Sequence, residues 1–290
     1  MATPTSIERL PPLPGIAIDL LNRISDCARD RNGLIDLLSE QPQLRSEVTQ
    51  VATQMYLQPA GHNVAVQASG GQSLLEQVDW ANLAEIAITV LVRGYLRRAL
   101  SVSEDYRYWR YTLACAVCCE QVAVGREEDS LLAYTAGLLH DIGRLALIAA
   151  YPNQYSNLLT LTDRMFAANE PFDFLEYERL LFGFDHFTTG AWVARVWKLP
   201  SWLHSIVGKF DEQASPERAK LVSTVRAGTR LAHSLGFGYL QSAPRADIKE
   251  ILGQFPDAEK HWQVLDSWEY AEETLRGKVR SRLQSYAAAE

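Results

Sequence analysis

The stretch that decides the fold is Gly137–Leu147, with the sequence GLLHDIGRLAL. Its apolar residues recur at i, i+4 and i+7, the spacing of residues that share one face of an α-helix. The apolar run around it predicts one continuous helix over 130–150. Two glycines, Gly137 and Gly143, lie inside this run, although each glycine destabilises a helix by about 1 kcal/mol relative to alanine. We therefore expect neighbouring helices to pack very close to this one.

An adjacent histidine and aspartate, His140 and Asp141, lie at the centre of the same run. An imidazole beside a carboxylate can bind a metal ion, and it can equally form hydrogen bonds inside the protein. The function of the chain depends on which of these two roles the pair has.

The composition limits the class of protein. The chain has 290 residues, 47% of them hydrophobic and 22% charged, which suits a folded protein with a large core. Its net charge of −7 argues against a nucleic-acid-binding protein, since phosphate contacts need a basic face. Four cysteines without regular spacing indicate a reducing compartment. The start of the chain lacks the pattern of a signal peptide, and we expect no apolar run to reach the roughly 18 residues of a membrane span. We expect a soluble cytoplasmic protein without membrane contact.

The rest of the chain predicts helices and no strands, because no stretch shows a sustained period of two. Beyond the central run, the apolar periodicity predicts helices over 16–24, 34–38, 44–55, 82–100, 108–124, 153–169, 171–182, 189–196, 202–210, 216–235, 248–252 and 262–287, with a loop over 59–71. The fold class is all-α. We predict an N-terminal helical subdomain over 1–105, a second helical subdomain over 106–240 and a C-terminal helical extension over 241–290.

Short motifs in a fixed order are spread over residues 7–240. They are LPPLP at 10–14, QPQL at 41–44, GLLHDIG at 137–143, Glu178, GFDH at 183–186, Gly190 and WKLP at 197–200. This set resembles the HDOD domain, an output domain of bacterial signalling proteins that is related to the HD metal-dependent phosphohydrolases. The resemblance implies a multi-helical fold in which an N-terminal bundle packs on an HD-like C-terminal part. It also implies a regulatory role, usually without demonstrated catalysis.

The resemblance further implies where a metal site would lie. An HD hydrolase binds its metal through an upstream histidine, the His-Asp pair and a downstream aspartate, and related phosphodiesterases add further histidines. In this chain His140 and Asp141 match the pair, and His186 matches one of the additional histidines. Tyr111 stands at the upstream position and Thr229 at the downstream one, while the later His-His falls at Lys209 and Phe210, with His233 one turn beyond Thr229. A hydrolytic metal needs several nitrogen or oxygen ligands. We interpret the five residues His140, Asp141, His186, Tyr111 and Thr229 as a vestigial site without a catalytic residue, metal or cofactor; if a divalent metal binds at all, its ligands would be His140, Asp141 and His186.

Two further features have simple structural interpretations. His140 and Asp141 would form a buried pair, each bonded to the other or to the backbone. Cys115, Cys118 and Cys119 lie within about one helical turn, and core packing accounts for them better than a zinc site or a redox sensor.

The sequence therefore predicts a non-catalytic regulatory module that acts by binding a protein or a ligand, either alone or as the output part of a two-component response regulator. Seven tryptophans and twelve tyrosines favour an exposed interaction surface, and we expect a homodimer as one form of partner. One alternative is a metal-dependent phosphohydrolase acting on nucleotides or cyclic dinucleotides. The other is a small-ligand sensor, which a closed polar pocket near the His-Asp helix would favour. The signal, the partner and the pathway are not encoded in any motif.

Overall fold

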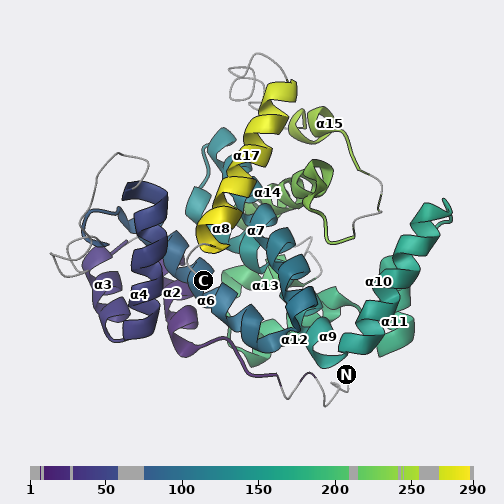
Figure 1. The fold of residues 1–290 in the computed structure, drawn as a ribbon, viewed down its shortest axis with the longest axis horizontal. Coiled ribbons are helices and arrows are strands. Elements are labelled where there is room, and N and C mark those ends of the chain that lie inside the picture. Colours follow the sequence, from purple (N-terminus) through teal and green to yellow (C-terminus); the bar gives the residue numbers. More distant parts are fainter. Residues whose placement is uncertain are drawn as a thin grey trace. The chain divides into compact units, whose positions relative to one another are not determined.

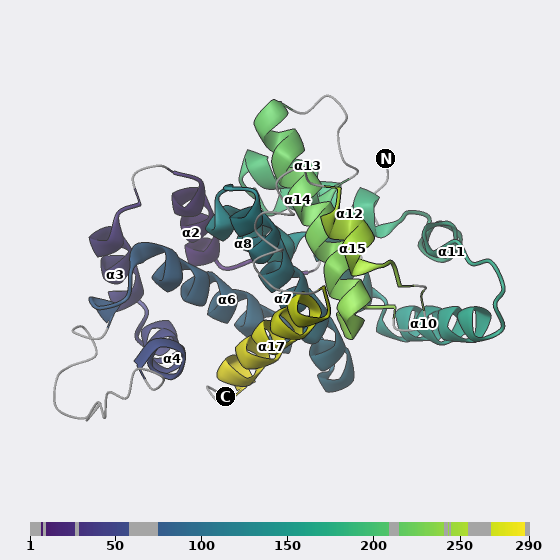
Figure 2. The same cartoon turned by 90° about the horizontal axis from the view of Figure 1, so that it is seen from above.

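The computed structural model describes residues 7, 10–26, 29–57, 75–208, 215–240, 243, 245–254 and 268–287, drawn in two views in Figures 1 and 2. Within these ranges the regular structure is helical and contains no strand, which confirms the all-α prediction. The predicted loop over 59–71 and the residues Lys209 and Phe210 lie outside the described residues.

The chain divides into two compact units. Unit 1 comprises Met1–Pro12 and Leu96–Val279, and unit 2 comprises Leu13–Tyr95 and Arg280–Glu290. These bounds differ from the three consecutive segments predicted from the sequence. The first boundary lies at residues 95 and 96 instead of 105, and the C-terminal extension is shared between the units.

Unit 2 is a small helical body. It contains α2 (Gly15–Ser25), α3 (Arg31–Ser39), α4 (Pro42–Ala52), the π-helical turn η1 (Thr53–Leu57) and α6 (Trp80–Ala99) as far as Tyr95. Proline precedes α2 and opens α4, where its fixed φ suits the first turn and its missing N–H costs nothing. Each helix buries an apolar stripe, for example Leu20, Leu21 and Ile24 of α2.

Unit 1 carries the remaining helices. They are α7 (Val102–Gly125), α8 (Ser130–Leu139), α9 (Ile142–Ala150), α10 (Pro152–Ala167), α11 (Phe174–Phe182), α12 (His186–Val196), α13 (Ser201–Val207), α14 (Pro216–Ala232), η2 (His233–Phe237), α15 (Ile248–Leu252) and most of α17 (Trp268–Ala287). Aspartate side chains cap α8, α11, α12 and α15 by accepting from backbone N–H groups of the first turn. Helix α7 packs extensively on α8 and α14, and α9 packs on α12 (Figure 1).

The helix expected over 130–150 is broken, so that part of the prediction is wrong. Helix α8 ends at Leu139 and α9 begins at Ile142, with Asp141 between them at φ −108° and ψ 27°. Side chains of α7 bond to the carbonyl groups at the break: the Thr112 hydroxyl donates to Leu138 O at 2.6 Å, and the Tyr108 hydroxyl donates to Asp141 O at 2.7 Å. The break turns the two residues of the pair in different directions.

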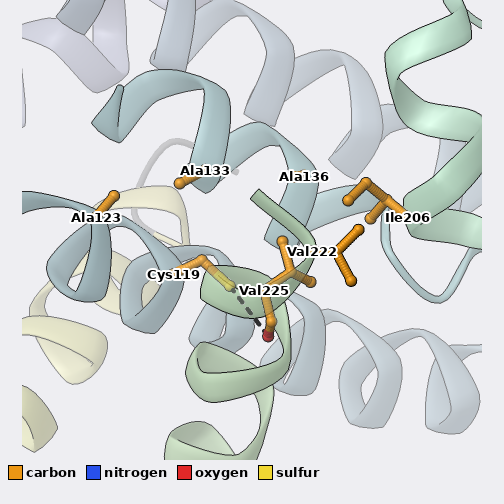
Figure 3. Close-up of a cluster of buried hydrophobic side chains, with 7 residues drawn as sticks. All are labelled: Cys119, Ala123, Ala133, Ala136, Ile206, Val222 and Val225. Carbon is orange, nitrogen blue, oxygen red and sulfur yellow. Dashed lines mark hydrogen bonds between the residues drawn. The ribbon is translucent and has the colours of Figure 1, made fainter. Parts of the chain in front are cut away.

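The three cysteines are core residues, as the sequence predicts. Cys115, Cys118 and Cys119 are free thiols and fully buried, and burial raises the pKa of each thiol. Cys119 belongs to a cluster of buried side chains where α7, α8, α13 and α14 meet (Figure 3). A Cβ atom on Gly137 or on Gly228 would lie within 2.7 Å of Cys119 Sγ, so α8 and α14 approach α7 through glycine. Burial and a raised pKa both disfavour the reactive thiolate, which favours core packing over a redox role for this cluster.

The central stretch is also the most apolar part of unit 1. By length and composition Ser130–Ala150 could cross a membrane, so the expectation that no run reaches that length is wrong. However, 89% of its apolar window is buried inside the protein. Burial among neighbouring helices accounts for this composition without a bilayer.

The contact between α9 and α12 gives a first testable prediction. A Cβ atom on Gly143 would lie 1.9 Å from His186 O and 2.5 Å from the backbone nitrogen of Gly190, so the backbone of α12 would have to move. Gly143→Ala should lower the free energy of unfolding by about 1–3 kcal/mol in a urea titration, as over-packing of a core does. Gly277 of α17 serves as the control, because a Cβ atom added there would have no other atom within 4 Å. Gly277→Ala should stabilise the protein by about 0.5–1 kcal/mol, and equal destabilisation by both substitutions would contradict the close packing.

Candidate functional site

His140 bonds away from Asp141. Its Nδ1 lies 2.8 Å from Gly137 O, and its Nε2 lies 2.9 Å from the hydroxyl of Tyr111 on α7. Because a carbonyl can only accept, Nδ1 carries the proton; in the neutral ring Nε2 then accepts from the tyrosine. Burial is the largest influence on this imidazole and lowers its pKa, in keeping with the neutral form. Both nitrogens of His140 are therefore used in internal hydrogen bonds.

Asp141 is paired with an arginine one helical turn further on. The carboxylate is 4% exposed, and its Oδ2 accepts from Nε of Arg144 in a buried ion pair. Burial is the largest single influence and would raise the pKa of Asp141, but the charge and hydrogen bond of Arg144, together with His186 and His140, lower it overall. The other oxygen, Oδ1, is buried and has no hydrogen-bond partner among the described residues.

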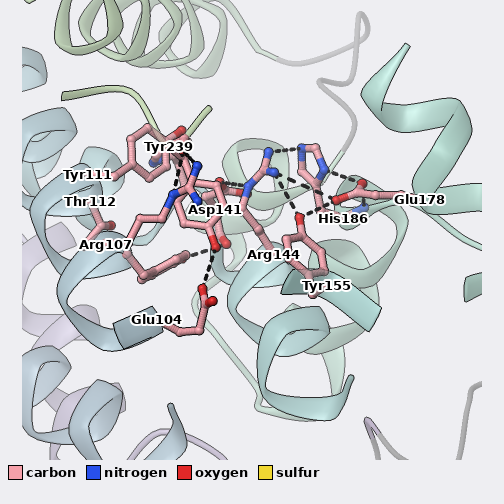
Figure 4. Close-up of polar contacts among 12 residues, drawn as sticks. Glu104, Arg107, Tyr111, Thr112, Asp141, Arg144, Tyr155, Glu178, His186 and Tyr239 are labelled. Carbon is pink, nitrogen blue, oxygen red and sulfur yellow. Dashed lines mark hydrogen bonds and ion pairs between the residues drawn. The ribbon is translucent and has the colours of Figure 1, made fainter. Parts of the chain in front are cut away.

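The guanidinium of Arg144 is the centre of the site (Figure 4). Besides Asp141, it donates to the hydroxyl of Tyr155 on α10 at 3.0 Å and to Nε2 of His186 on α12 at 3.3 Å. Its Nη1 lies 3.9 Å from Oε1 of Glu178 on α11. One buried side chain thus connects the α8–α9 junction to three helices.

Glu178 and His186 complete this network. Glu178 is fully buried; its Oε2 accepts from Nδ1 of His186 at 2.6 Å and from the backbone N–H of His186 at 2.9 Å. Its Oε1 accepts from the Tyr155 hydroxyl at 2.6 Å. Since arginine can only donate, Nε2 of His186 must accept, and the ring is neutral with its proton on Nδ1. Burial would raise the pKa of Glu178, but the hydrogen bond from His186 and the charge of Arg144 lower it.

The residues present do not fit a divalent metal ion. A metal ligand needs an available lone pair, yet Nε2 of His140 accepts from Tyr111 and Nε2 of His186 accepts from Arg144. Asp141 is neutralised by Arg144, whose fixed positive charge would repel a cation. In the part of the chain that the structure describes, no group of three or more His, Cys, Asp or Glu side chains could hold a metal.

Among the described residues, Thr229 forms no hydrogen bond with His140 or Asp141. Its hydroxyl donates to Arg226 O at 3.0 Å, within α14. It nevertheless lines the same pocket as Tyr111 and Arg144, with a volume of about 340 Å³. The structure therefore brings the five predicted site residues into one region in three groups: His140 with Tyr111, Asp141 with His186 through Arg144, and Thr229 in the pocket wall.

Four residues with a part in this region received no site role from the sequence: Arg144, Tyr155, Glu178 and Tyr239. Arg144 follows Asp141 at i+3, a spacing at which helical side chains meet, so this pair had a readable signal. The ring of Tyr239, 5.2 Å from Cζ of Arg144, carried no such signal.

Comparison with known proteins places this arrangement in context. The model of the HDOD domain family matches residues 10–212. No curated protein matches the sequence.

Three solved structures share the fold. An HDOD domain protein of unknown function from Geobacter sulfurreducens has 20% identity and a TM-score of 0.72 over 98% of this chain and 96% of that one. A candidate phosphohydrolase from Shewanella amazonensis SB2B has 18% identity and a TM-score of 0.59 over 98% and 96%. A candidate signal transduction protein from Marinobacter aquaeolei VT8 has 19% identity and a TM-score of 0.66 over 98% of this chain and 63% of that one. At these identities the likeness concerns the fold alone.

Proposed function

The chain belongs to the HDOD domain family, and from this premise we propose that it is a non-catalytic module of signal transduction that acts by binding. The observation that carries the proposal is the position of Arg144. Its guanidinium pairs with Asp141 and reaches Glu178 and His186, so the side chains that could hold a metal hold an internal cation instead. A permanently charged arginine cannot activate a water molecule as a metal does.

The competing function is a metal-dependent phosphohydrolase. The fold is shared with a protein named as a candidate phosphohydrolase, but in this chain Nε2 of His140, Nε2 of His186 and Oδ2 of Asp141 are all occupied. Oδ1 of Asp141 is without a partner among the described residues, and one oxygen is too few ligands for a hydrolytic metal. We expect the purified protein to release no product from nucleotides, cyclic dinucleotides or phosphomonoesters. The assay is chromatographic product analysis with and without added Mn²⁺ or Fe²⁺, together with metal analysis of the protein as purified.

The control variant for that assay is Asp141→Ala. Turnover that requires Mn²⁺ or Fe²⁺ and disappears in Asp141→Ala would overturn the proposal. A chelator should also leave the melting temperature of the wild-type protein unchanged, because only a bound ion stabilises the fold by mass action.

The remaining parts of the proposal concern partners and location. The module would work in the cytoplasm, without binding nucleic acid or a membrane, on a protein partner or on a second copy of itself, and it could form the output part of a two-component response regulator. Exposed leucines on α11, Leu180 at 72% and Leu181 at 52%, are apolar positions that a partner could cover. Light scattering over a range of concentrations tests self-association, and a monomer throughout would exclude it.

A second function has its own observation. The pocket lined by Tyr111, Arg144 and Thr229 has a volume of about 340 Å³, within the usual range of small-molecule sites. It opens to solvent and its lining is more apolar than polar, so it differs from the closed polar pocket expected from the sequence. It favours a sensor in which a small ligand changes the binding surface of the module.

A further inference from the structure

The pocket beside the Arg144 network is built entirely from unit 1. Its wall combines residues of α7, α9, α14 and η2 with the segment that follows η2: Tyr111, Arg144, Thr229, Arg230, His233, Tyr239, Leu240, Ala243 and Ala246. Figure 4 shows Tyr239 and Tyr111 close together beside the network.

The segment after η2 is held in place by side chains from elsewhere in unit 1. Arg107 donates to Tyr239 O at 3.0 and 2.7 Å, and Arg110 donates to Gly236 O at 2.8 Å. Gly236 has φ 88°, a left-handed conformation that favours glycine and lets the chain leave the helix. The Ser234 hydroxyl donates to Ala246 O at 2.7 Å. The wall is therefore formed before any ligand arrives, which lowers the cost of binding.

The charged groups of the described pocket wall are all of one kind. They are the arginines Arg144 and Arg230, and no carboxylate is among the described lining residues. Nε2 of His233 donates its N–H to Ala243 O at 3.2 Å, a hydrogen bond between two residues of the wall itself.

The two arginines have N–H groups to spare. Three of the five N–H groups of Arg144 are used, on Asp141, Tyr155 and His186. The positive charge of Arg144 is already neutralised by Asp141. Arg144 would therefore contribute directed hydrogen-bond donors to a ligand more than net electrostatic attraction. Arg230 pairs at 3.2 Å with Glu250, whose side chain is 64% exposed, and an exposed pair of this kind is weak enough for an anion to replace.

The other lining residues that the structure describes carry no acidic side chain. Leu240, Ala243 and Ala246 provide an apolar surface, and the hydroxyl of Thr229 adds a neutral polar group. A ligand that satisfies this wall needs an anionic end with several acceptor oxygens and a compact apolar part.

We propose that this pocket binds a small organic anion, with its carboxylate or phosphate group facing Arg144 and Arg230 and its apolar part against Leu240, Ala243 and Ala246. The proposal deepens the sensor role described above and rests on it. The shared chemistry is an oxyanion on a small apolar body, and the two head groups are distinguished by experiment.

The test is isothermal titration calorimetry of the full chain with three probes of similar size: phenyl phosphate, benzoate and uncharged benzyl alcohol. We expect saturable binding of at least one anion and none of benzyl alcohol, and the tighter anion identifies the head group. Arg230→Gln should weaken that binding about tenfold, the scale of one lost charge-assisted hydrogen bond. Arg226→Gln removes the same charge from an exposed position of the same helix outside the pocket wall and should leave binding within about twofold.

A second variant separates the pocket from surface charge. Ala246→Phe fills the apolar part and keeps every cation, so it should abolish binding while the melting temperature stays close to that of the wild type. Binding of neither anion to the wild type overturns the proposal, as does equal weakening by Arg230→Gln and Arg226→Gln, or unchanged binding by Ala246→Phe.

Phenyl phosphate also tests the pocket assignment separately from the proposed non-catalytic function. If phenyl phosphate is bound and remains intact with Mn²⁺ present, both the binding role and the pocket assignment stand. If phenol is released in a metal-dependent reaction, the non-catalytic function is wrong. If phenyl phosphate and benzoate both fail to bind and no phenol is released, only the pocket assignment is wrong.

Discussion

Replacing Arg144 with methionine is expected to lower the free energy of unfolding by about 3–5 kcal/mol, the usual cost of removing one partner from a buried ion pair. Asp141 and Glu178 would both remain buried, at 4% and 0% exposure, without the guanidinium that faces them. Methionine fills much of the same space, so the loss reports on charge and hydrogen bonding more than on a cavity. Urea titration of the wild type and the variant at pH 7 measures it.

The matched control is Arg179→Met. Arg179 forms an ion pair of 2.8 Å with Asp185 and its own side chain is 44% exposed. The Asp185 carboxylate is 2% exposed but also accepts from the N–H and the hydroxyl of Thr188, so it keeps two donors without Arg179 and the loss should be about 1 kcal/mol. The same substitution therefore removes the arginine partner of a buried aspartate in both cases. The two sites differ in the burial of the arginine and in the number of its other buried partners. A loss in Arg144→Met no larger than that in Arg179→Met would show that Arg144 is not the centre of the network.

The pH dependence of the same variant should change sign. In the wild type the pKa of Asp141 and that of Glu178 are below their ordinary values, because Arg144 and His186 outweigh the effect of burial. A carboxyl group with a lowered pKa stabilises the fold above its unfolded pKa, about 4, and loses that contribution as the pH falls through the lower folded value. Without Arg144, burial should raise the pKa of Asp141. The variant should then become more stable as the pH is lowered from 7 to 5, whereas these groups give the wild type no such gain.

Most helices could be predicted from the sequence because their apolar stripes are local. The stripes of α2 and α4 follow directly from the residue spacing, and proline marks where both helices begin. The apolar periodicity does not predict the break at His140, because the apolar run continues through it. The contacts at the break come from Thr112 and Tyr108 on another helix, 26 and 33 residues away, and no local pattern carries that information.

The candidate site, too, could be predicted only in part from the sequence. The resemblance to a family identified His140, Asp141, His186, Tyr111 and Thr229, and the structure places all five around one network and one pocket. What each side chain bonds to could not be derived. Glu178 and Tyr155 reach Arg144 from separate helices, so their roles depend on how α10 and α11 pack.

From the sequence, His140 and Asp141 are expected to form one pair. In the structure the two side chains bond to different residues. His140 bonds to Gly137 and Tyr111, and Asp141 bonds to Arg144; the two side chains share no hydrogen bond. At neutral pH the imidazole is uncharged, because burial lowers its pKa, so little charge coupling remains between the neighbours. Substitutions at His140 and at Asp141 should therefore change the free energy of unfolding almost independently.

Double-mutant cycles measure that independence. Asp141→Asn combined with Arg144→Met should show a coupling energy of about 2–3 kcal/mol, since either single substitution already leaves the other charge buried and unpaired. His140→Ala combined with Asp141→Asn should show less than about 0.5 kcal/mol, the scatter of additive sites. A third cycle, His140→Ala with Tyr111→Phe, should give about 1 kcal/mol, the value of one internal hydrogen bond. If His140 couples to Asp141 more strongly than Asp141 couples to Arg144, the two residues act as one unit after all, and Arg144 is an accessory to it.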